Sequence, residues 1–407
     1  MIIWLCACLF CILCFSCSSD IEKSARDGLY VINLDSTVNN KTSLPFSSVY
    51  KGIKTVILET NKSCLIGNIN KIRVHGEYLY VLDMLIAKSL LVFDMEGNFI
   101  RKIGSVGQGP GEYTEPWDFA IDKENGIIYI LDSRSQRINK YSITTGGYIH
   151  SFKLNINIRI HNIEFVGGRL YADAYFMKHS NDNYLLCSIN DSTGKIDGKY
   201  LNVMKYNKGY SNTTSVDAQT FFLRENGNVM FTQRFMDHII EINKDSIFSL
   251  FTIKSDDNFT PKDIKEIIEK RVSVDRGGGS SVVYQFKKFH KISDYIENGD
   301  KVMFSRMKGT AINNILYDKQ TGETATIRGA VSGMLFKEQS RNDLFFLNLK
   351  LGCYDANGAY YHVSSREISK IKGYARDNAL ISDLDKLEKI RTLDDDANPI
   401  IFYYEFK

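Results

Sequence analysis

The chain reads Gly76-Glu77-Tyr78-Leu79-Tyr80-Val81-Leu82-Asp83 and then repeats this pattern as Gly126-Ile127-Ile128-Tyr129-Ile130-Leu131-Asp132. After each copy come a second apolar segment and a second turn, first Leu91-Val92-Phe93-Asp94 with Glu96-Gly97-Asn98 and then Asn139-Lys140-Tyr141-Ser142 with Thr145-Gly146-Gly147. Tyr80 and Tyr129 are 49 residues apart. Short apolar runs between glycine turns are typical of antiparallel strands joined by hairpins. The sequence therefore predicts a repeated β-meander.

The combination of a turn and an aromatic residue occurs four more times, as Gly167-Gly168-Arg169-Leu170-Tyr171, Gly227-Asn228-Val229-Met230-Phe231, Asp300-Lys301-Val302-Met303-Phe304 and Asn357-Gly358-Ala359-Tyr360-Tyr361. The aromatic residues at 80, 129, 171, 231, 304 and 361 are spaced by 49, 42, 60, 73 and 57 residues. Repeats of about 40–60 residues with four strands each have the size of propeller blades. We therefore expect an all-β fold, a six-bladed β-propeller, over residues 28–407.

The composition agrees with a globular, strand-rich chain. Of the 407 residues, 43% are hydrophobic and 24% are charged, which excludes a disordered or fibrous protein. The 29 glycines, 23 tyrosines and 24 phenylalanines beside only 5 prolines favour β-structure with many turns. Lys plus Arg (51) nearly balance Asp plus Glu (48), so the net charge of +3 favours neither a nucleic-acid partner nor binding to a charged membrane surface.

Two helices are expected to interrupt the strands. Thr260 and Pro261 are a typical N-cap and first helical residue, and apolar residues at 264, 267 and 268 predict an inserted helix near 260–276. Leu380, Leu384 and Leu387 recur at helical spacing and predict another helix near 379–391. Strand-like segments at 28–35 and 53–58, together with an apolar strand at 400–406, could join the first blade to the last, because an open ring would leave unpaired edges.

The N-terminus indicates export. Residues 1–16 are uncharged and apolar, too short to cross a bilayer comfortably, and are followed by a polar segment, which is typical of a signal peptide. Ser16-Cys17 at this boundary resembles the lipid-attachment sequence of bacterial lipoproteins, so we expect a lipid on Cys17 and a tether over 17–27. A membrane anchor and an ordinary cleaved signal are the alternatives. The remaining cysteines, Cys64, Cys187 and Cys353, have apolar neighbours and are expected to be buried thiols.

One connector resembles a known family. Residues 103–113, Ile-Gly-Ser-Val-Gly-Gln-Gly-Pro-Gly-Glu-Tyr, lead into Pro116-Trp117-Asp118-Phe119-Ala120-Ile121-Asp122. This is similar to the linker and following strand of six-bladed β-propeller lipoproteins from Gram-negative gut bacteria, related to NHL and TolB-like propellers. The resemblance implies fold and export, and it carries over no catalytic residue. Read alone, the glycines at 107–111 could also cradle a phosphate, although a tight crossing between blades explains them as well.

The inner strands of a propeller line its central channel, where ligands commonly bind. Aligning the repeats places Lys71, Asp118, Asn162, Thr220, Lys291 and Lys350 at the start of the inner strands, preceded by Asn70, Trp117, His161, Gln219, His290 and Leu349. We expect a channel-mouth binding site made of Lys71, Trp117, Asp118, His161, Asn162, His290, Lys291 and Lys350. The lysines would attract a polar or anionic ligand and Trp117 would stack on it. Alternatively, the ring is only the wet mouth of a channel.

An enzyme is the alternative to a binding protein. Six-bladed lactonases hold a divalent metal in the channel through acidic and amide oxygens. Only Asp118 and Asn162 are of that type in this ring, and three lysines would oppose a cation. The sequence thus favours no metal, no cofactor and no catalytic residue, with a metal-dependent hydrolase as the second hypothesis.

From the sequence we expect an exported binding or scaffolding module, held by its lipid at the outer membrane, on either its periplasmic or its surface side. The expected partners are the membrane and a glycan, peptide or protein, without nucleic acid.

Overall fold

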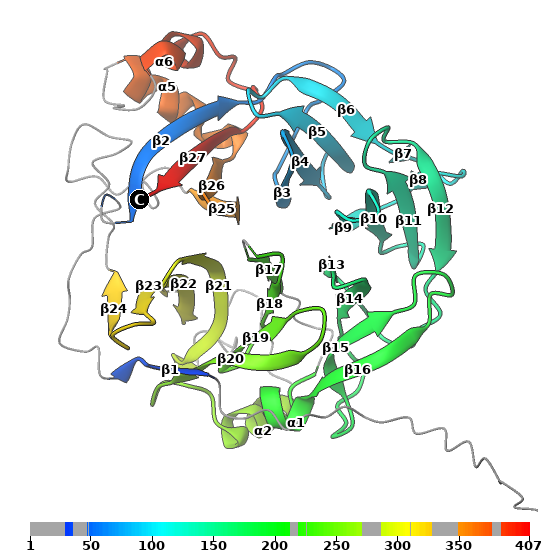
Figure 1. Ribbon diagram of the computed structural model, residues 1–407, viewed down its shortest axis with the longest axis vertical. Helices are drawn as coiled ribbons and strands as arrows, with labels where there is room; N and C mark the ends of the chain where they lie inside the picture. The colour runs from blue at the N-terminus through cyan, green and yellow to red at the C-terminus, as the bar shows by residue number, and fades with distance from the viewer. Residues whose placement is uncertain are drawn as a thin grey trace, which may run out of the picture.

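The computed structural model describes residues 29–35, 47, 49–211, 219–224, 226–270, 286–309, 311–327, 349–376 and 384–407. Six antiparallel sheets stand around a central axis as the blades of a propeller (Figure 1). The prediction of an all-β, six-bladed β-propeller is confirmed. The predicted signal peptide at 1–16, the lipid site Cys17 and the tether at 17–27 lie outside the described residues.

Each blade is a meander of four strands, and the first strand of each meander is innermost (Figure 1). The four strands are consecutive in the chain in five blades, whereas the outer strand of blade 6 comes from the N-terminal part of the chain. Blade 1 contains β3 (Lys71–His75), β4 (Tyr78–Asp83), β5 (Ser89–Asp94) and β6 (Phe99–Ile103). Blade 2 contains β9 (Pro116–Asp122), β10 (Ile127–Asp132), β11 (Arg137–Ser142) and β12 (Tyr148–Lys153). Blade 3 contains β13 (Ile163–Val166), β14 (Arg169–Asp173), β15 (Tyr184–Ile189) and β16 (Ile196–Asn202).

The other half of the ring is built in the same way. Blade 4 contains β17 (Phe221–Leu223), β18 (Val229–Phe231), β19 (His238–Ile242) and β20 (Ile247–Lys254), and β1 (Tyr30–Asn33) adds a fifth strand. Blade 5 contains β21 (Phe289–Asn298), β22 (Lys301–Lys308), β23 (Ala311–Asp318) and β24 (Thr324–Ile327). Blade 6 contains β25 (Lys350–Tyr354), β26 (Gly358–Val363), β27 (Ile400–Phe406) and β2 (Tyr50–Ile57).

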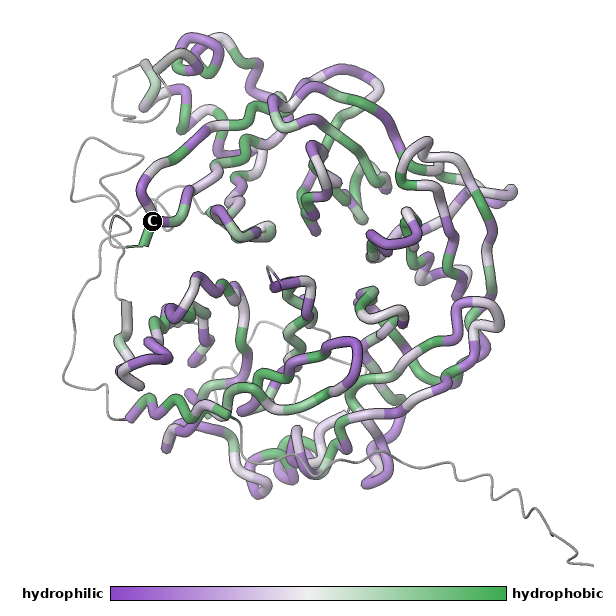
Figure 2. Tube along the Cα trace, in the orientation of Figure 1, coloured by the Kyte–Doolittle hydropathy of each residue, from purple (hydrophilic) through white to green (hydrophobic). Residues whose placement is uncertain are grey.

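The aromatic residues that define the repeat occupy matching places. Every one of them lies in the second strand of its blade and is buried: Tyr80, Tyr129, Tyr171, Phe231, Phe304 and Tyr361. A blade cannot bury both faces of its sheet alone, so these rings fill the space that neighbouring blades share. Apolar residues accordingly recur along the strands, while the loops are more polar (Figure 2).

The ring closes in blade 6, where the two ends of the chain meet. β2 pairs antiparallel with the C-terminal β27, with Thr55 opposite Phe402, so the segment at 53–58 closes the ring as predicted. The segment at 28–35 does not take part in this closure. It forms β1, which pairs in parallel with β20, Val31 opposite Thr252, because its inward residues find their core in blade 4.

The helices lie outside the blades. α1 (Val203–Asn207) follows blade 3, α2 (Pro261–Glu269) follows blade 4, and η3 (Ser365–Glu367), α5 (Ile368–Arg376) and α6 (Leu384–Arg391) connect β26 to β27. α2 confirms the first part of the helix predicted at 260–276, with Thr260 and Asp263 forming a reciprocal capping box, and residues 271–276 lie outside the described residues. α6 confirms the helix near 379–391 from residue 384 onward.

Candidate functional site

A buried aspartate at the end of the second strand fixes the mouth of the channel in three blades. Asp83 accepts hydrogen bonds from the backbone N–H groups of Gly67, Asn68, Leu85 and Ile86. Asp132 accepts them from Thr114, Glu115 and Arg134, and Asp173 from His161 and Asn162. Asp83 and Asp132 each join the chain that enters the inner strand to the loop after the second strand. Asp173 joins the chain that enters the inner strand to the end of the second strand itself. These charged hydrogen bonds hold this end of the blades rigidly.

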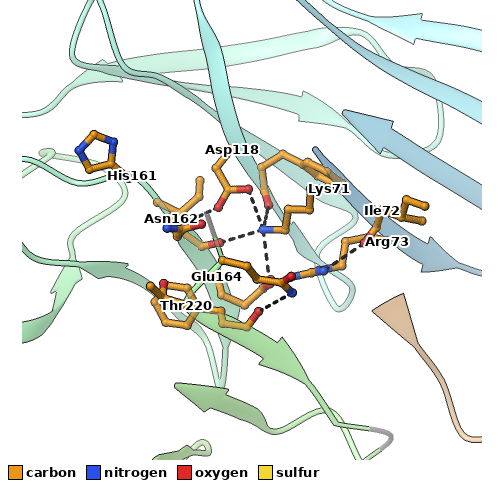
Figure 3. Close-up of polar contacts among 12 residues, drawn as sticks. Lys71, Ile72, Arg73, Asp118, His161, Asn162, Glu164 and Thr220 are labelled. Atoms are coloured by element: carbon orange, nitrogen blue, oxygen red, sulfur yellow. Dashed lines mark hydrogen bonds and ion pairs between the residues drawn. The ribbon is translucent and has the colours of Figure 1, made fainter. Parts of the chain in front are cut away.

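Lys71, the first predicted site residue, is buried in an ion network rather than exposed in the channel (Figure 3). Its Nζ lies 2.8 Å from Asp118 Oδ1 and donates hydrogen bonds to the carbonyl oxygens of Phe119 (2.7 Å) and Ile163 (3.3 Å). The other carboxylate oxygen of Asp118 accepts a 2.8 Å hydrogen bond from Ile163 N–H. Lys71 therefore connects the inner strands β3, β9 and β13.

One pleat deeper, Arg73 and Glu164 form the second half of this network. Arg73 Nη2 lies 2.7 Å from Glu164 Oε2, and Lys71 Nζ lies 3.7 Å from the same oxygen. All four charged side chains are at most 9% exposed. The cluster of Lys71, Arg73, Asp118 and Glu164, which we call the channel network, thus contains two positive and two negative charges and balances itself.

Burial and pairing oppose each other in the channel network. Burial alone would raise the pKa of Glu164, but the charges of Lys71 and Arg73 and the hydrogen bond from Arg73 more than offset it, and the pKa lies below its ordinary value. Burial also raises the pKa of Asp118 and lowers the pKa of Lys71, against the attraction between the two. The four charged side chains of the channel network pair with one another, so little of their charge is available to bind a ligand.

Asn162 and Thr220 belong to a neighbouring polar cluster. Asn162 Nδ2 donates a 2.7 Å hydrogen bond to Asp173 Oδ2, and the Thr220 hydroxyl donates one of 3.3 Å to the same oxygen, which links blade 3 to blade 4. Burial raises the pKa of Asp173 to about 7, against the hydrogen bonds from Asn162 and His161. The structure thus pairs Lys71 with Asp118 in one cluster. In the other cluster, Asn162 and Thr220 are joined through Asp173.

The rings of Trp117, His161 and Tyr175 form a third cluster. It is next to the two polar clusters, because Trp117 directly precedes Asp118 and His161 directly precedes Asn162. The ring of His161 lies 5.2 Å from Trp117 and 5.5 Å, edge-on, from Tyr175. Trp117 is partly exposed, whereas Tyr175 is buried. Burial, helped by the charge of Arg159, lowers the pKa of His161 to about 4, so the imidazole is neutral at pH 7.

We expect His161 to make the protein less stable in mild acid. Between about pH 6.5 and pH 4 the unfolded chain binds a proton at this residue that the folded protein does not bind, so stability falls as the pH falls through this range. His161→Phe should reduce the drop in melting temperature between pH 7.5 and pH 5, while the same change at the exposed His150 should not. Equal pH dependence of both variants and the wild type would show that His161 does not act in this way.

The other predicted residues lie in blades 5 and 6. His290 and Lys291 stand near the start of β21, and Lys350 begins β25, so all three lie on inner strands as expected. His290 is buried and its carbonyl oxygen accepts a 2.8 Å hydrogen bond from Phe235 N–H, whereas Lys350 is exposed. Of the three lysines predicted to attract an anion, Lys350 thus presents its side chain most openly.

Sequence reasoning missed Arg73, Glu164 and Asp173. The alternation of a strand was the available signal, because Arg73 and Glu164 each stand two positions after a residue of the aligned ring, on the same side of the strand. Asp173 could have been found from the aspartate that ends the quoted repeat at 83 and 132. Because Arg73, Glu164 and Asp173 bind the predicted site residues or their neighbours, they hold the site in a fixed arrangement.

Large apolar side chains are exposed at the same end of blades 1–3. We call this end, formed by residues 58–70, 84–88, 154–162 and 174–183 and by Trp117, the blade 1–3 face. Leu65 is 52% exposed, Leu85 57%, Ile86 67% and Met177 68%. A Cβ added at Gly67 would overlap the Ile86 side chain, so Ile86 lies directly over the loop that carries Leu65.

Positive charges occur in the same loops as these apolar side chains. The loops of the blade 1–3 face carry the four cations Lys62, Lys88, Arg159 and Lys178. Within the part of the chain that the structure describes, none of them forms an ion pair. These loops contain two acids, Glu59, which accepts hydrogen bonds from Asn61 and Phe99, and Asp182. The blade 2 loops at the same end add Glu112, Glu115 and Arg134, and Arg134 Nη1 lies 3.5 Å from Glu115 Oε1. The loops at this end therefore combine exposed apolar side chains with a small excess of positive charge.

In the glycine-rich connector at 103–113, a carboxylate of the chain itself binds the backbone N–H group that a phosphate could have used. β7 (Ser105–Val106) and β8 (Glu112–Tyr113) pair in parallel, and the Glu112 carboxylate accepts a 2.7 Å hydrogen bond from Gly109 N–H. A Cβ added at Gly107 would overlap this carboxylate, which explains the glycine. Glu112 thus occupies the place that a bound phosphate would take, and the connector is a tight crossing between blades 1 and 2.

The described residues contain no group of three or more His, Cys, Asp or Glu side chains that could hold a metal ion. Their helices are all too short or too polar to pass through a bilayer. The thiols of Cys64, Cys187 and Cys353 are buried as predicted, and burial raises the pKa of each.

The fold and the channel define a six-bladed β-propeller with a locked, charge-balanced centre. Residues 29–405 match the model of a family described as Domain of unknown function (DUF4934), and the chain belongs to this family. No curated protein matches the chain.

The solved structures similar to this chain include two from Bacteroides species. The crystal structure of a predicted exported protein from Bacteroides fragilis NCTC 9343 has a TM-score of 0.71 at 19% identity and covers 93% of this chain and 99% of that one. A member of the DUF4221 family from Bacteroides vulgatus has a TM-score of 0.50 at 11% identity, covering 88% of this chain and 97% of that one. At these identities the likeness concerns the fold.

Proposed function

We propose that this protein is an exported, lipid-anchored propeller that binds a partner protein through the blade 1–3 face. The observation that carries the proposal is that the loops at this end of blades 1 and 3 expose the apolar side chains of Leu65, Leu85, Ile86 and Met177. The same loops carry Lys62, Lys88, Arg159 and Lys178, none of which forms an ion pair among the described residues. Exposed apolar groups with polar rims are characteristic of interaction sites, and Trp and Met are enriched in them. Export is supported by the apolar residues 1–16 before Cys17 and by the similar fold of the Bacteroides protein that is itself predicted to be exported.

The rigidity of this face favours tight binding. Asp83 holds the loops of Leu65 and of Leu85 and Ile86 together by four backbone hydrogen bonds, between 2.7 and 3.2 Å long. A surface that is already ordered loses little conformational entropy when a partner docks. The apolar side chains are therefore presented in a fixed arrangement.

The chemistry of the face defines the partner. Leu, Ile and Met side chains make contacts with other apolar side chains, whereas a saccharide would depend mainly on an aromatic platform such as Trp117. The cations Lys62, Lys88, Arg159 and Lys178 favour a partner that carries acidic side chains, whose approach they would also steer. We therefore infer a protein with an apolar contact area and with Asp and Glu beside it.

A channel hydrolase has less support. Such an enzyme would need oxygen ligands at this channel mouth, and both carboxylate oxygens of Asp118 are already engaged, one by Lys71 and the other by Ile163 N–H. The Asn162 side chain is held in place by the hydrogen bond that its amide nitrogen donates to Asp173. Releasing Asp118 to a metal would leave Lys71 buried without its closest negatively charged partner. The binding function requires no such rearrangement.

The test begins with photo-crosslinking in cells. A benzoylphenylalanine in place of Met177 should capture one defined protein, and the same group in place of Ile149, exposed on the outer strand β12, should not. With the captured protein purified, Ile86→Ser should weaken binding about tenfold, because burial of one aliphatic side chain contributes about 1.5 kcal/mol or more. Ile149→Ser is the matched control, and added salt should also weaken binding.

Two results would contradict the proposed function. The first is equal crosslinking at positions 177 and 149, which would show no preference for the blade 1–3 face. The second is binding of a saccharide that Trp117→Ala abolishes while Ile86→Ser leaves it unchanged.

A further inference from the structure

β1 is an additional strand on the rim of the disc. The other blades have four strands, and β1 lies outside β20 as the fifth strand of blade 4 (Figure 1). It is attached by four paired residues, by a stacked contact of Tyr30 with Phe251, and by an edge-on contact of Tyr30 with Tyr317 of blade 5. The chain thus enters the described fold at the rim where blades 4 and 5 meet.

The two sides of β1 differ sharply. Ile32 is fully buried and Leu34 nearly so, whereas the alternate residues Leu29 and Val31 are 72% and 42% exposed. The far end is polar, where Asp35 accepts hydrogen bonds from the Ser255 hydroxyl and from Asp256 N–H. The exposed apolar residues therefore gather at the end of β1 that the preceding chain reaches first.

The length of the preceding chain limits where this rim can be. Leu29 follows Cys17 by 12 residues. Such a segment spans at most about 40 Å when fully extended, and about 20 Å on average when flexible. A domain of this size is roughly 50 Å across, so a lipid on Cys17 brings the β1 rim to the bilayer before any other part of the disc.

We infer that the rim formed by β1 is the membrane-facing surface of the protein, with Leu29 and Val31 in contact with the lipid bilayer. This inference rests on the lipid attachment at Cys17 that is part of the proposed function. The disc then stands with its β1 rim on the membrane and with blades 1 and 2, which lie across the ring in Figure 1, away from it. The blade 1–3 face remains open to a partner in this orientation.

The experiment uses the full-length, lipidated protein in vesicles of phosphatidylethanolamine and phosphatidylglycerol. An environment-sensitive fluorophore is attached to Val31→Cys, and in a second preparation to Ile149→Cys on the distant strand β12. We expect a blue-shifted emission that spin-labelled lipid quenches at position 31, and neither effect at position 149. A label on Leu29→Cys provides a second readout should Val31→Cys disturb β1.

The alternatives give different results. Equal quenching at 31 and 149, or quenching at 149 alone, would overturn the orientation while leaving the lipid anchor intact. A blue shift at 31 that persists without vesicles and without quenching would mean that a second copy of the chain covers β1, which also overturns it. Vesicle binding by Cys17→Ala equal to that of the wild type would instead refute the lipid anchor of the proposed function.

Discussion

Glu164→Gln should destabilise the protein by about 3–5 kcal/mol, since removing one partner of a buried ion pair leaves the other charge uncompensated. Glutamine keeps the size of the side chain, so the loss is electrostatic. Arg73, now without its 2.7 Å partner, and Lys71 would remain buried near Asp118 alone. The shift of the urea midpoint and of the melting temperature measures the effect.

A double variant separates the charge from the packing. Arg73→Met with Glu164→Gln should be less damaging than the sum of the single changes, because no unpaired guanidinium is left. Glu405→Gln is the matched control, since it breaks the Lys54–Glu405 pair of equal length, 2.7 Å, in which Lys54 is 63% exposed. It should cost less than about 1 kcal/mol. Equal effects at 164 and 405 would show that the channel network does not hold blades 1–3 together.

Phe402→Ala should cost about 3–5 kcal/mol, the usual loss when a buried phenylalanine leaves a cavity. Phe402 is fully buried in β27, between Thr55 of β2 and Tyr361 of β26. It therefore lies where the N-terminal and C-terminal parts of the chain are joined. Thermal and urea unfolding measure the loss.

Ile149→Ala is the control for this second prediction, because an exposed side chain on β12 should change stability by less than about 0.5 kcal/mol. A cost at Phe402 no larger than at Ile149 would mean that β27 is not packed within a closed blade.

The blades could be predicted because each one repeats the same local chemistry. A turn glycine or Asx residue followed by an apolar pair and an aromatic residue gives a hairpin wherever it stands, and the buried rings at Tyr80, Tyr129 and Tyr361 show the result. The same reasoning misplaced the segment at 28–35. Alternating apolar residues show that a strand is half-buried, but they do not show which sheet edge it joins.

The candidate site could be predicted only in part. Alignment of the repeats correctly placed Lys71 and Lys350 on inner strands. It could not predict that the Lys71 side chain is buried and the Lys350 side chain is exposed. Whether Lys71 is free or paired depends on Asp118 from the next blade and Glu164 from the blade after that, 47 and 93 residues further along the chain. Such pairing across blades has no local signal in the sequence. The helix α5 was also not predicted. Its buried apolar residues are few, Ile368, Ile371 and Ala375, and they stand among polar and charged residues, so the helical pattern in the sequence is weak.

The closure of the ring is the central claim, and a designed disulfide tests it most directly. Lys54 and Tyr403 are opposite residues of β2 and β27, 349 positions apart in the chain, and neither side chain is fully buried. Lys54→Cys with Tyr403→Cys should form a disulfide on mild oxidation, seen by mass spectrometry of the digested protein. Lys54→Cys with Tyr404→Cys should not form one, because the fully buried Tyr404 lies on the other face of the sheet. A bond in the second variant, or none in the first, would contradict the closed propeller.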